Sequence, residues 1–188
     1  MSSSYRLTLE NWLKTLDIKA NKVLDIGGSQ LNVKGRTKSW DVDEYLIADL
    51  PNPHKDSPKP DIEIDLNLSG NTPTDLRFDL IFCLEVFDYV YDPMNALKRI
   101  ANTLADNGTA WITFQSIYPH HQPVEDDALR YMPGGIKKLA ESAGLKIQEM
   151  IPRFAETDAF MDFCRAERLR AAKGFDHRTM GYIVRMVK

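Results

Sequence analysis

The residues best suited to chemistry lie where two short apolar segments end. Segment 23–26 runs directly into Gly27 and Gly28, which predicts a buried strand followed by a tight turn. Glycine allows a positive φ in such a turn, and a ligand can approach a backbone that carries no Cβ. Segment 45–48 ends at Asp49, roughly twenty residues after the glycines. At this offset a carboxylate can accept hydrogen bonds from both hydroxyls of a ribose, so the spacing predicts a nucleoside-containing ligand.

A second group of side chains that could do chemistry lies between residues 115 and 132. This segment contains His120 and His121 and shows neither helical nor strand periodicity. A long loop of this kind inside a compact domain is more often functional than a simple connection. Adjacent histidines rarely point the same way, and no third ligand follows at a suitable offset, so we predict no metal site.

Strand-like and helix-like segments alternate along the chain and would position these residues. Strands are predicted at 23–26, 45–49, 61–66, 78–84, 110–114, 145–151 and 181–187. Helices are predicted from an N-cap at Thr8 to Leu16, from Pro93 after an N-cap at Asp92 to Asn107, and over 133–143 and 157–173. The alternation predicts an α/β, Rossmann-like, doubly wound fold, in which a mostly parallel seven-stranded sheet carries helices on both faces. Segment 30–40 lacks a helical pattern, and its three basic residues suit either a phosphate-binding loop or a solvated turn.

The composition restricts the classes of protein that need consideration. The 188 residues carry a net charge of −3 and suit one domain, residues 1–188. This charge gives no electrostatic reason to expect nucleic acid or an anionic membrane as a partner. Cys83 and Cys164 have no metal-type spacing and favour a reduced, cytoplasmic setting. No apolar run is long enough to span a bilayer.

The order and spacing of these segments resemble the class I S-adenosylmethionine-dependent methyltransferases, and most of all the small-domain group called methyltransferase type 11. Residues 23–28 resemble the glycine-rich first motif of that family. Asp49 and Asp65 resemble its acids after the second and third strands, and residues 78–90 resemble its fourth-strand motif. The likeness extends over roughly residues 21–151.

The resemblance implies a methyltransferase whose cofactor is S-adenosyl-L-methionine. In this family the glycine turn admits the amino-acid part of the cofactor, the second-strand acid holds the ribose, and the following motifs border the adenine and the methionine moiety. The residues assigned to the cofactor in this way are Asp25, Gly27, Gly28, Ser29, Asp49, Leu50, Asp65, Leu66, Cys83, Leu84 and Glu85. Tyr118, His120 and His121 would contact the acceptor or take its proton. The expected acceptor is a small molecule or a glycan precursor rather than nucleic acid.

Two alternatives remain at the level of sequence. A nicotinamide-dependent dehydrogenase would share the first turn and Asp49, but residues 27–32 lack the G-x-G-x-x-G motif that it requires. The second alternative is a non-catalytic regulatory module of the same fold that binds S-adenosylmethionine without turnover. Leu31 and the absence of a clear catalytic signature motivate it, because the family usually has a small residue near the position of Leu31. The sequence indicates no oligomeric state.

Overall fold

The computed structural model describes residues 4–53, 56–70, 72, 75–120, 122–154, 162, 166–167 and 178–188. Its helices are α1 (Ser4–Leu13), α2 (Pro93–Thr103) and α3 (Pro133–Ser142), with one 3₁₀ turn, η1 (Phe87–Tyr89). Its strands are β1 (Asp17–Ile26), β2 (Ser39–Asp49), β3 (Ile62–Glu63), β4 (Phe78–Cys83), β5 (Leu104–Gln115), β6 (Lys146–Phe154) and β7 (Thr179–Val187). No described helix is long and apolar enough to cross a membrane.

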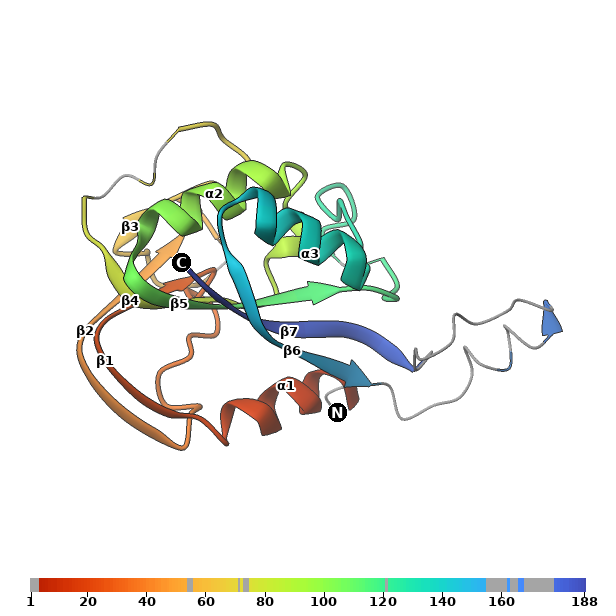
Figure 1. Ribbon diagram of the computed structural model, residues 1–188, viewed down its shortest axis with the longest axis horizontal. Coiled ribbons are helices and arrows are strands. Elements are labelled where there is room, and N and C mark those ends of the chain that lie inside the picture. The colour runs from red at the N-terminus through yellow and green to blue at the C-terminus, as the bar shows by residue number, and fades with distance from the viewer. Residues whose placement is uncertain are drawn as a thin grey trace.

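One seven-stranded sheet in the order β3-β2-β1-β4-β5-β7-β6 organises the molecule (Figure 1). β1 to β5 run parallel to one another, whereas β7 lies antiparallel between β5 and β6. The parallel register places Ile26 of β1 beside Ala48 and Cys83, and Cys83 beside Ile112. The turns that follow these strands therefore meet at one edge of the sheet, where open α/β sheets bind their ligands.

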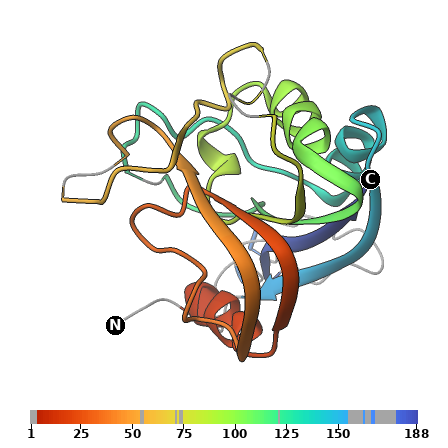
Figure 2. The same ribbon diagram turned by 90° about the vertical axis from the view of Figure 1, so that its left-hand side faces the viewer.

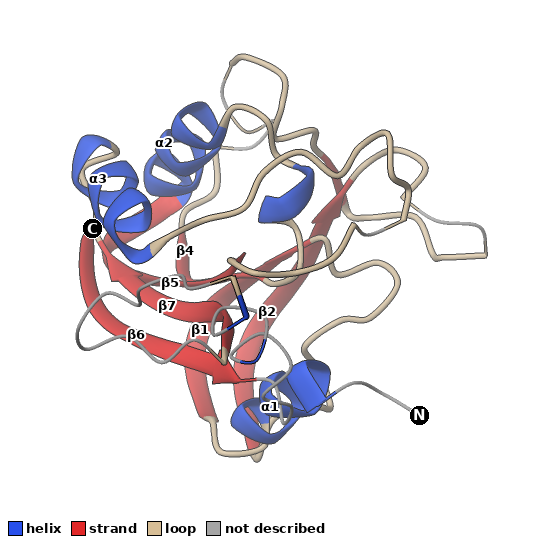
Figure 3. Ribbon diagram, turned by 90° about the vertical axis from the view of Figure 1, so that its right-hand side faces the viewer, coloured by secondary structure: helices blue, strands red, loops and turns tan. Residues whose placement is uncertain are grey.

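Helices cover both faces of the sheet, as the sequence predicted (Figures 1 and 3). On one face α1 packs its Leu9 and Leu13 against Phe82 and Trp111 of the sheet. On the other face α2 and α3 enclose a larger cluster that includes Leu24, Ile81, Leu97 and Ile136. The near-continuous apolar run of β4 follows from this arrangement, because a central parallel strand is buried on both sides.

Several predicted boundaries were wrong for identifiable reasons. α1 begins at Ser4, so Thr8 lies within the helix and is not its N-cap; the buried Tyr5 extends the apolar stripe by one turn. α2 ends at Thr103 rather than Asn107, because Leu104 turns to extended backbone and pairs with Phe78 of β4. The predicted helix 157–173 lies almost entirely outside the described residues.

Other predictions of local structure are confirmed. The Asp92 side chain accepts a hydrogen bond from the Asn95 N–H at 3.1 Å and caps α2, with Pro93 at its first position. No regular element lies between β1 and β2, in agreement with the pattern of segment 30–40. Figure 2 shows the unpredicted part of β1 and β2, a long two-stranded extension toward α1. Ile18 of this extension joins the apolar cluster under α1.

Candidate active site

The glycine turn after β1 has no space for side chains at its two glycines. Gly27 has a φ of +81° and its N–H donates to the Ala48 carbonyl of β2 at 2.8 Å. A Cβ on Gly27 would lie 2.4 Å from Val86 Cγ2, and a Cβ on Gly28 would lie 2.6 Å from Asp25 Cγ. Any side chain at either position would therefore clash with its neighbours, and the positive φ of Gly27 also favours glycine.

Gly27→Ala is expected to lower the free energy of unfolding by about 2 kcal/mol, from strain at positive φ together with the clash against Val86. Gly35→Ala provides the matched control, because Gly35 has a φ of +85° but no atom within 4 Å of the added Cβ. The control isolates the backbone strain, of about 1 kcal/mol. Urea unfolding of both variants measures the difference, and equal losses would contradict the importance of the Val86 contact.

Asp25 lies beneath this turn rather than facing a ligand. Its buried carboxylate accepts hydrogen bonds through Oδ2 from the Val33 N–H at 2.7 Å and from the Tyr45 hydroxyl at 2.6 Å. These bonds fix the irregular segment between β1 and β2, which has no helix to order it. Burial raises the pKa of Asp25 to about 6, and the hydrogen bond from Tyr45 offsets part of that rise.

This pKa predicts how stability depends on pH. The ordinary pKa of the Asp25 carboxyl is 3.8. Between that value and about 6 the folded protein keeps a proton that the unfolded chain has lost, so stability falls as pH rises from about 4 to 6. Asp25→Asn should remove this fall, because an amide oxygen in the place of Oδ2 can accept both hydrogen bonds. The variant should be more stable at pH 7 by about 1–2 kcal/mol. Urea unfolding at pH 4.5 and 7 tests this, and parallel pH dependence of both proteins would contradict it.

Asp49 joins the tip of β2 to the glycine turn. Its Oδ2 accepts from the Ser29 N–H at 3.1 Å, and its Oδ1 accepts from the Leu50 N–H at 2.8 Å. Each carboxylate oxygen has a second lone pair that suits a ribose hydroxyl. The buried Ser29 hydroxyl has no hydrogen-bond partner among the described residues. Leu31 and Leu50, which follow Ser29 and Asp49 in the chain, are 45% and 44% exposed. Polar acceptors, an unpaired hydroxyl and exposed apolar side chains together fit a nucleoside such as that of S-adenosylmethionine.

The other residues assigned to the cofactor differ in what they can offer. Leu66 and Cys83 are buried in the core, so only their backbone atoms are available to a ligand. Burial raises the pKa of the Cys83 thiol well above its ordinary value, which keeps it protonated. Asp65 accepts from the Asn67 N–H at 2.9 Å. The Leu84 side chain packs toward the α1 face.

Glu85, directly after Leu84, anchors an ion pair that the sequence did not predict. Its backbone has a φ of +59°, and its N–H donates to Thr113 Oγ1 at 2.7 Å. The Thr113 hydroxyl in turn donates to Glu85 Oε1 at 2.9 Å. Arg153 of β6 is fully buried and donates to both Glu85 oxygens, at 2.5 and 3.3 Å. No sequence signal marked Arg153, because it lies at the end of an otherwise ordinary edge strand.

Tyr5 of α1 closes this cluster from above. The Arg153 guanidinium lies 3.5 Å from the centre of the Tyr5 ring, and Arg153 Nη2 donates to the Tyr5 carbonyl at 3.1 Å. Tyr118 also contacts this ring, with ring centres 4.9 Å apart. The structure thus brings Tyr118, a predicted site residue that follows β5, against the ring that contacts the Arg153–Glu85 pair.

Loop 116–132 is held by hydrogen bonds at both ends. At its start the Ser116 N–H donates to the Met180 carbonyl at 2.8 Å, and near its end the Tyr131 hydroxyl donates to the Phe87 carbonyl at 2.9 Å. His120 lies at the surface, with its side chain 82% exposed and Nδ1 3.4 Å from Asp127 Oδ2. His121 lies outside the described residues.

Arg130 holds Asp127 in a two-pronged ion pair, with N–O distances of 2.6 and 2.7 Å. The Asp127 side chain is 1% exposed, so its position under His120 is well defined. Among the described residues, no group of three or more His, Cys, Asp or Glu side chains is placed to hold a metal ion.

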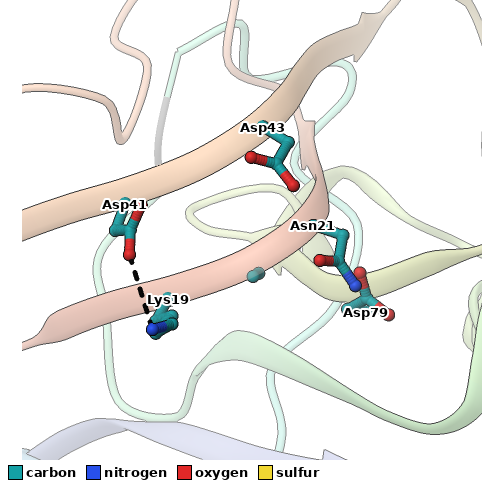
Figure 4. A pocket seen from close by; sticks show the side chains of 6 residues that line it. Lys19, Asn21, Asp41, Asp43 and Asp79 are labelled. Carbon is teal, nitrogen blue, oxygen red and sulfur yellow. Dashed lines mark ion pairs between the residues drawn. The ribbon is translucent and has the colours of Figure 1, made fainter.

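A cavity of about 400 Å³ lies away from this edge, at the amino-terminal ends of β1, β2 and β4 (Figure 4). Its lining residues are Lys19, Ala20, Asn21, Asp41, Asp43 and Asp79. Lys19 pairs with Asp41 at 3.8 Å, and both side chains are largely exposed. Because the turns that carry the glycines and Asp49 lie at the opposite ends of these strands, this cavity is separate from the cofactor site that the sequence predicts.

Comparison with known proteins identifies the family. A family model described as DREV methyltransferase matches residues 6–165. No curated protein matches the chain. Among solved structures, the chain is similar to an S-adenosylmethionine-dependent methyltransferase from Mesorhizobium loti, with 14% identity, a TM-score of 0.62 and 98% of each chain covered. A corresponding enzyme from Clostridium acetobutylicum shows 13% identity and a TM-score of 0.60, over 97% of this chain and 89% of that one.

A further similar structure is a complex from Haloferax volcanii between the Trm112 methyltransferase activator and a methyltransferase. It shows 15% identity and a TM-score of 0.61, over 98% of this chain and 88% of that one. At these identities the structural likeness establishes the fold, whereas the family model covers most of the chain. The protein is a class I S-adenosylmethionine-dependent methyltransferase, and the chain belongs to the DREV methyltransferase family.

Proposed function

We propose that this enzyme methylates a small-molecule or glycan-type acceptor in the cytoplasm, and that the acceptor binds beside Glu85 and Tyr118. The observation that carries the proposal is the convergence of Gly27, Asp49 and Glu85 at the carboxyl edge of the parallel strands. The net charge of −3 supports a small acceptor rather than nucleic acid.

The contacts indicate which part of the cofactor each residue would bind. When bound, S-adenosylmethionine supplies a methyl group on a positively charged sulfur, which is already activated, so the protein mainly contributes alignment. Asp49 would hold the ribose with its remaining lone pairs. Gly27 and Gly28 would leave room for the amino-acid part. Arg153 balances the charge of Glu85, so the carboxylate keeps its position without adding an unpaired negative charge to the site.

His120 is the proposed acceptor of the substrate's proton. Asp127 faces Nδ1 of the imidazole, an arrangement that places the ring proton on that nitrogen and leaves Nε2 to accept another. Arg130 keeps the Asp127 carboxylate in place. The sequence also offered Tyr118 and His121 for contact with the acceptor; for Tyr118 the position beside Tyr5 supports this role.

Calorimetry with S-adenosylmethionine tests the proposed cofactor site. Asp49→Ala is expected to weaken binding by roughly 1.5–2.5 kcal/mol, the scale of hydrogen bonds to a charged group. Asp41→Ala is the matched control, because Asp41 lies in the same strand but on its exposed amino-terminal half. Its affinity should equal that of the wild type.

An unchanged dissociation constant in Asp49→Ala would show that the ribose is held elsewhere. Tight binding of the cofactor by the wild type, without turnover of any acceptor class, would instead favour the non-catalytic binding module. A screen that contains sugars, phenols, amines and RNA separates these outcomes. Release of S-adenosylhomocysteine is the signal common to all of them.

A further inference from the structure

The connection from β1 to β2 contains no helix, although a connection between parallel strands usually carries one. Residues 27–38 leave the end of β1, return along the α1 side of the sheet and enter β2 at Ser39, which pairs with Asp17 at the start of β1 (Figure 2). The first residues of this loop are the glycine turn and Ser29. The contacts that hold the loop therefore also set the shape of the predicted cofactor site.

Arg36 holds the middle of this loop together from its far end. Its Nη1 donates to the Leu31 carbonyl at 3.0 Å and to the Asn32 carbonyl at 3.4 Å. Its backbone N–H donates to the Val33 carbonyl at 3.0 Å. In a helix, these three successive carbonyls would accept from backbone N–H groups further along the helix. Here a single arginine supplies the donors, so it takes over part of the work of the missing helix.

Glu10 of α1 fixes the direction of the Arg36 guanidinium. Arg36 Nη2 donates to Glu10 Oε1 at 2.6 Å, and Arg36 Nε donates to Glu10 Oε2 at 3.2 Å. Such a two-pronged pair sets an orientation as well as a distance. The two side chains are only 17% and 24% exposed, so solvent screens this pair less than it screens a pair at the open surface. The position of the loop carbonyls thus depends on α1, which is distant from β2 in the sequence.

Two hydrogen bonds connect the loop held by Arg36 to the strand ends. The Val33 N–H donates to Asp25 Oδ2 at 2.7 Å, and the Val33 side chain is buried in the apolar cluster under α1. The Ser29 N–H donates to Asp49 Oδ2 at 3.1 Å. Burial raises the pKa of Asp25, and the positive charge of Arg36 is among the influences that offset this rise. Arg36, Asp25 and the glycine turn therefore form one connected group of residues.

We propose that Glu10 and Arg36 are positioning residues for S-adenosylmethionine, and that their ion pair holds residues 29–33 in the shape that binds the cofactor. This inference rests on the cofactor site proposed above and adds α1 to it. The two residues act through the loop carbonyls and not through contact with the cofactor. When the pair is broken, the loop samples other shapes, and Ser29 no longer keeps its place beside Asp49.

Calorimetry of the full chain with S-adenosylhomocysteine at pH 7 tests the pair. Arg36→Met should weaken binding about tenfold, because the affinity falls with the fraction of molecules whose loop has the competent shape. Glu10→Gln should weaken it at least about threefold, since the neutral amide cannot accept both hydrogen bonds. The double variant should bind no more weakly than Arg36→Met alone, because the two side chains act as one unit.

Lys38→Met is the matched control. Lys38 lies in the same loop and pairs with Asp17 at 2.7 Å, but at the end away from the glycine turn, and both side chains are about 60% exposed. Its affinity for S-adenosylhomocysteine should equal that of the wild type. Arg36→Lys keeps the charge and one hydrogen bond to Glu10, and it should recover part of the affinity that Arg36→Met loses.

Amide hydrogen exchange separates positioning of the loop from support of the whole fold. In Arg36→Met the Val33 amide should exchange faster, whereas the amide of Leu24 in β1 should keep its protection. A merely structural role would lower the protection of both amides and leave the dissociation constant of the folded protein unchanged.

The outcomes distinguish this inference from the proposed function. Wild-type affinity in both Arg36→Met and Glu10→Gln, or an equal loss in Lys38→Met, would overturn the positioning role alone, provided that Asp49→Ala still weakens binding. No binding of S-adenosylhomocysteine by the wild type would overturn the proposed cofactor site and this inference together. If Arg36→Met does not fold, Glu10→Gln decides the question, because it keeps the size and one hydrogen-bond acceptor of the side chain.

Discussion

Arg153→Met is expected to lower the free energy of unfolding by about 3 kcal/mol. Removing one partner of a buried ion pair leaves the other charge uncompensated, which costs roughly 3–5 kcal/mol when both are fully buried. The Glu85 side chain is 32% exposed, so solvent screens part of its charge and places the expected loss at the lower end. The variant also loses the contact between the guanidinium and the Tyr5 ring.

Urea unfolding at pH 7 measures this loss, and a double variant separates its causes. Glu85→Gln combined with Arg153→Met removes the unpaired charge and should recover part of the stability. Arg185→Met is the control. Arg185 also lies in a strand near an aromatic ring, 5.9 Å from the centre of the Trp111 ring, but among the described residues it has no carboxylate at ion-pair distance. It should cost less than about 1 kcal/mol. A similarly small loss in Arg153→Met would refute the structural importance of the pair.

His120→Ala is expected to reduce kcat about 100-fold or more, at the level that general bases contribute. The affinity for S-adenosylmethionine should remain unchanged, because the histidine lies in the loop after β5 and not at the glycine turn. The rate of S-adenosylhomocysteine release, measured with an acceptor found by the screen, checks the first expectation. Calorimetry checks the second.

Variants in the same loop test whether the Asp127 carboxylate orients the imidazole of His120 for catalysis. Asp127→Asn should also lower kcat, because the imidazole loses the carboxylate that faces Nδ1. Glu125→Gln is the control, since Glu125 is exposed in the same loop and has no proposed role. A His120→Ala variant with wild-type kcat would identify His120 as a solvated surface residue, and its 82% exposure would then need no functional explanation.

Local sequence patterns were sufficient to predict most of the sheet. The apolar run of β4 predicts a central buried strand because both of its faces are covered, and the alternation in β6 predicts a strand. The Asp92 cap of α2 and the end of α3 before Gly144 follow from side-chain and backbone preferences that act within a few residues. The beginning of α1 was missed because Tyr5 is held in the helix by contacts with distant strands.

In the candidate site, too, some features follow from local sequence patterns and others only from the folded chain. By itself the sequence predicted the family through its resemblance, and it placed the glycine turn and Asp49 at the ends of two strands, because these features occur at fixed offsets along the chain in folds of this class. Only the tertiary structure decided that Asp25 accepts hydrogen bonds from Val33 and Tyr45, and that Leu66 and Cys83 face the core. It alone also brought Tyr5, Glu85 and Arg153 together across as many as 148 positions of the chain. Such contacts depend on the order in which the strands pair. A local pattern of residues does not indicate which distant charge will pair with another.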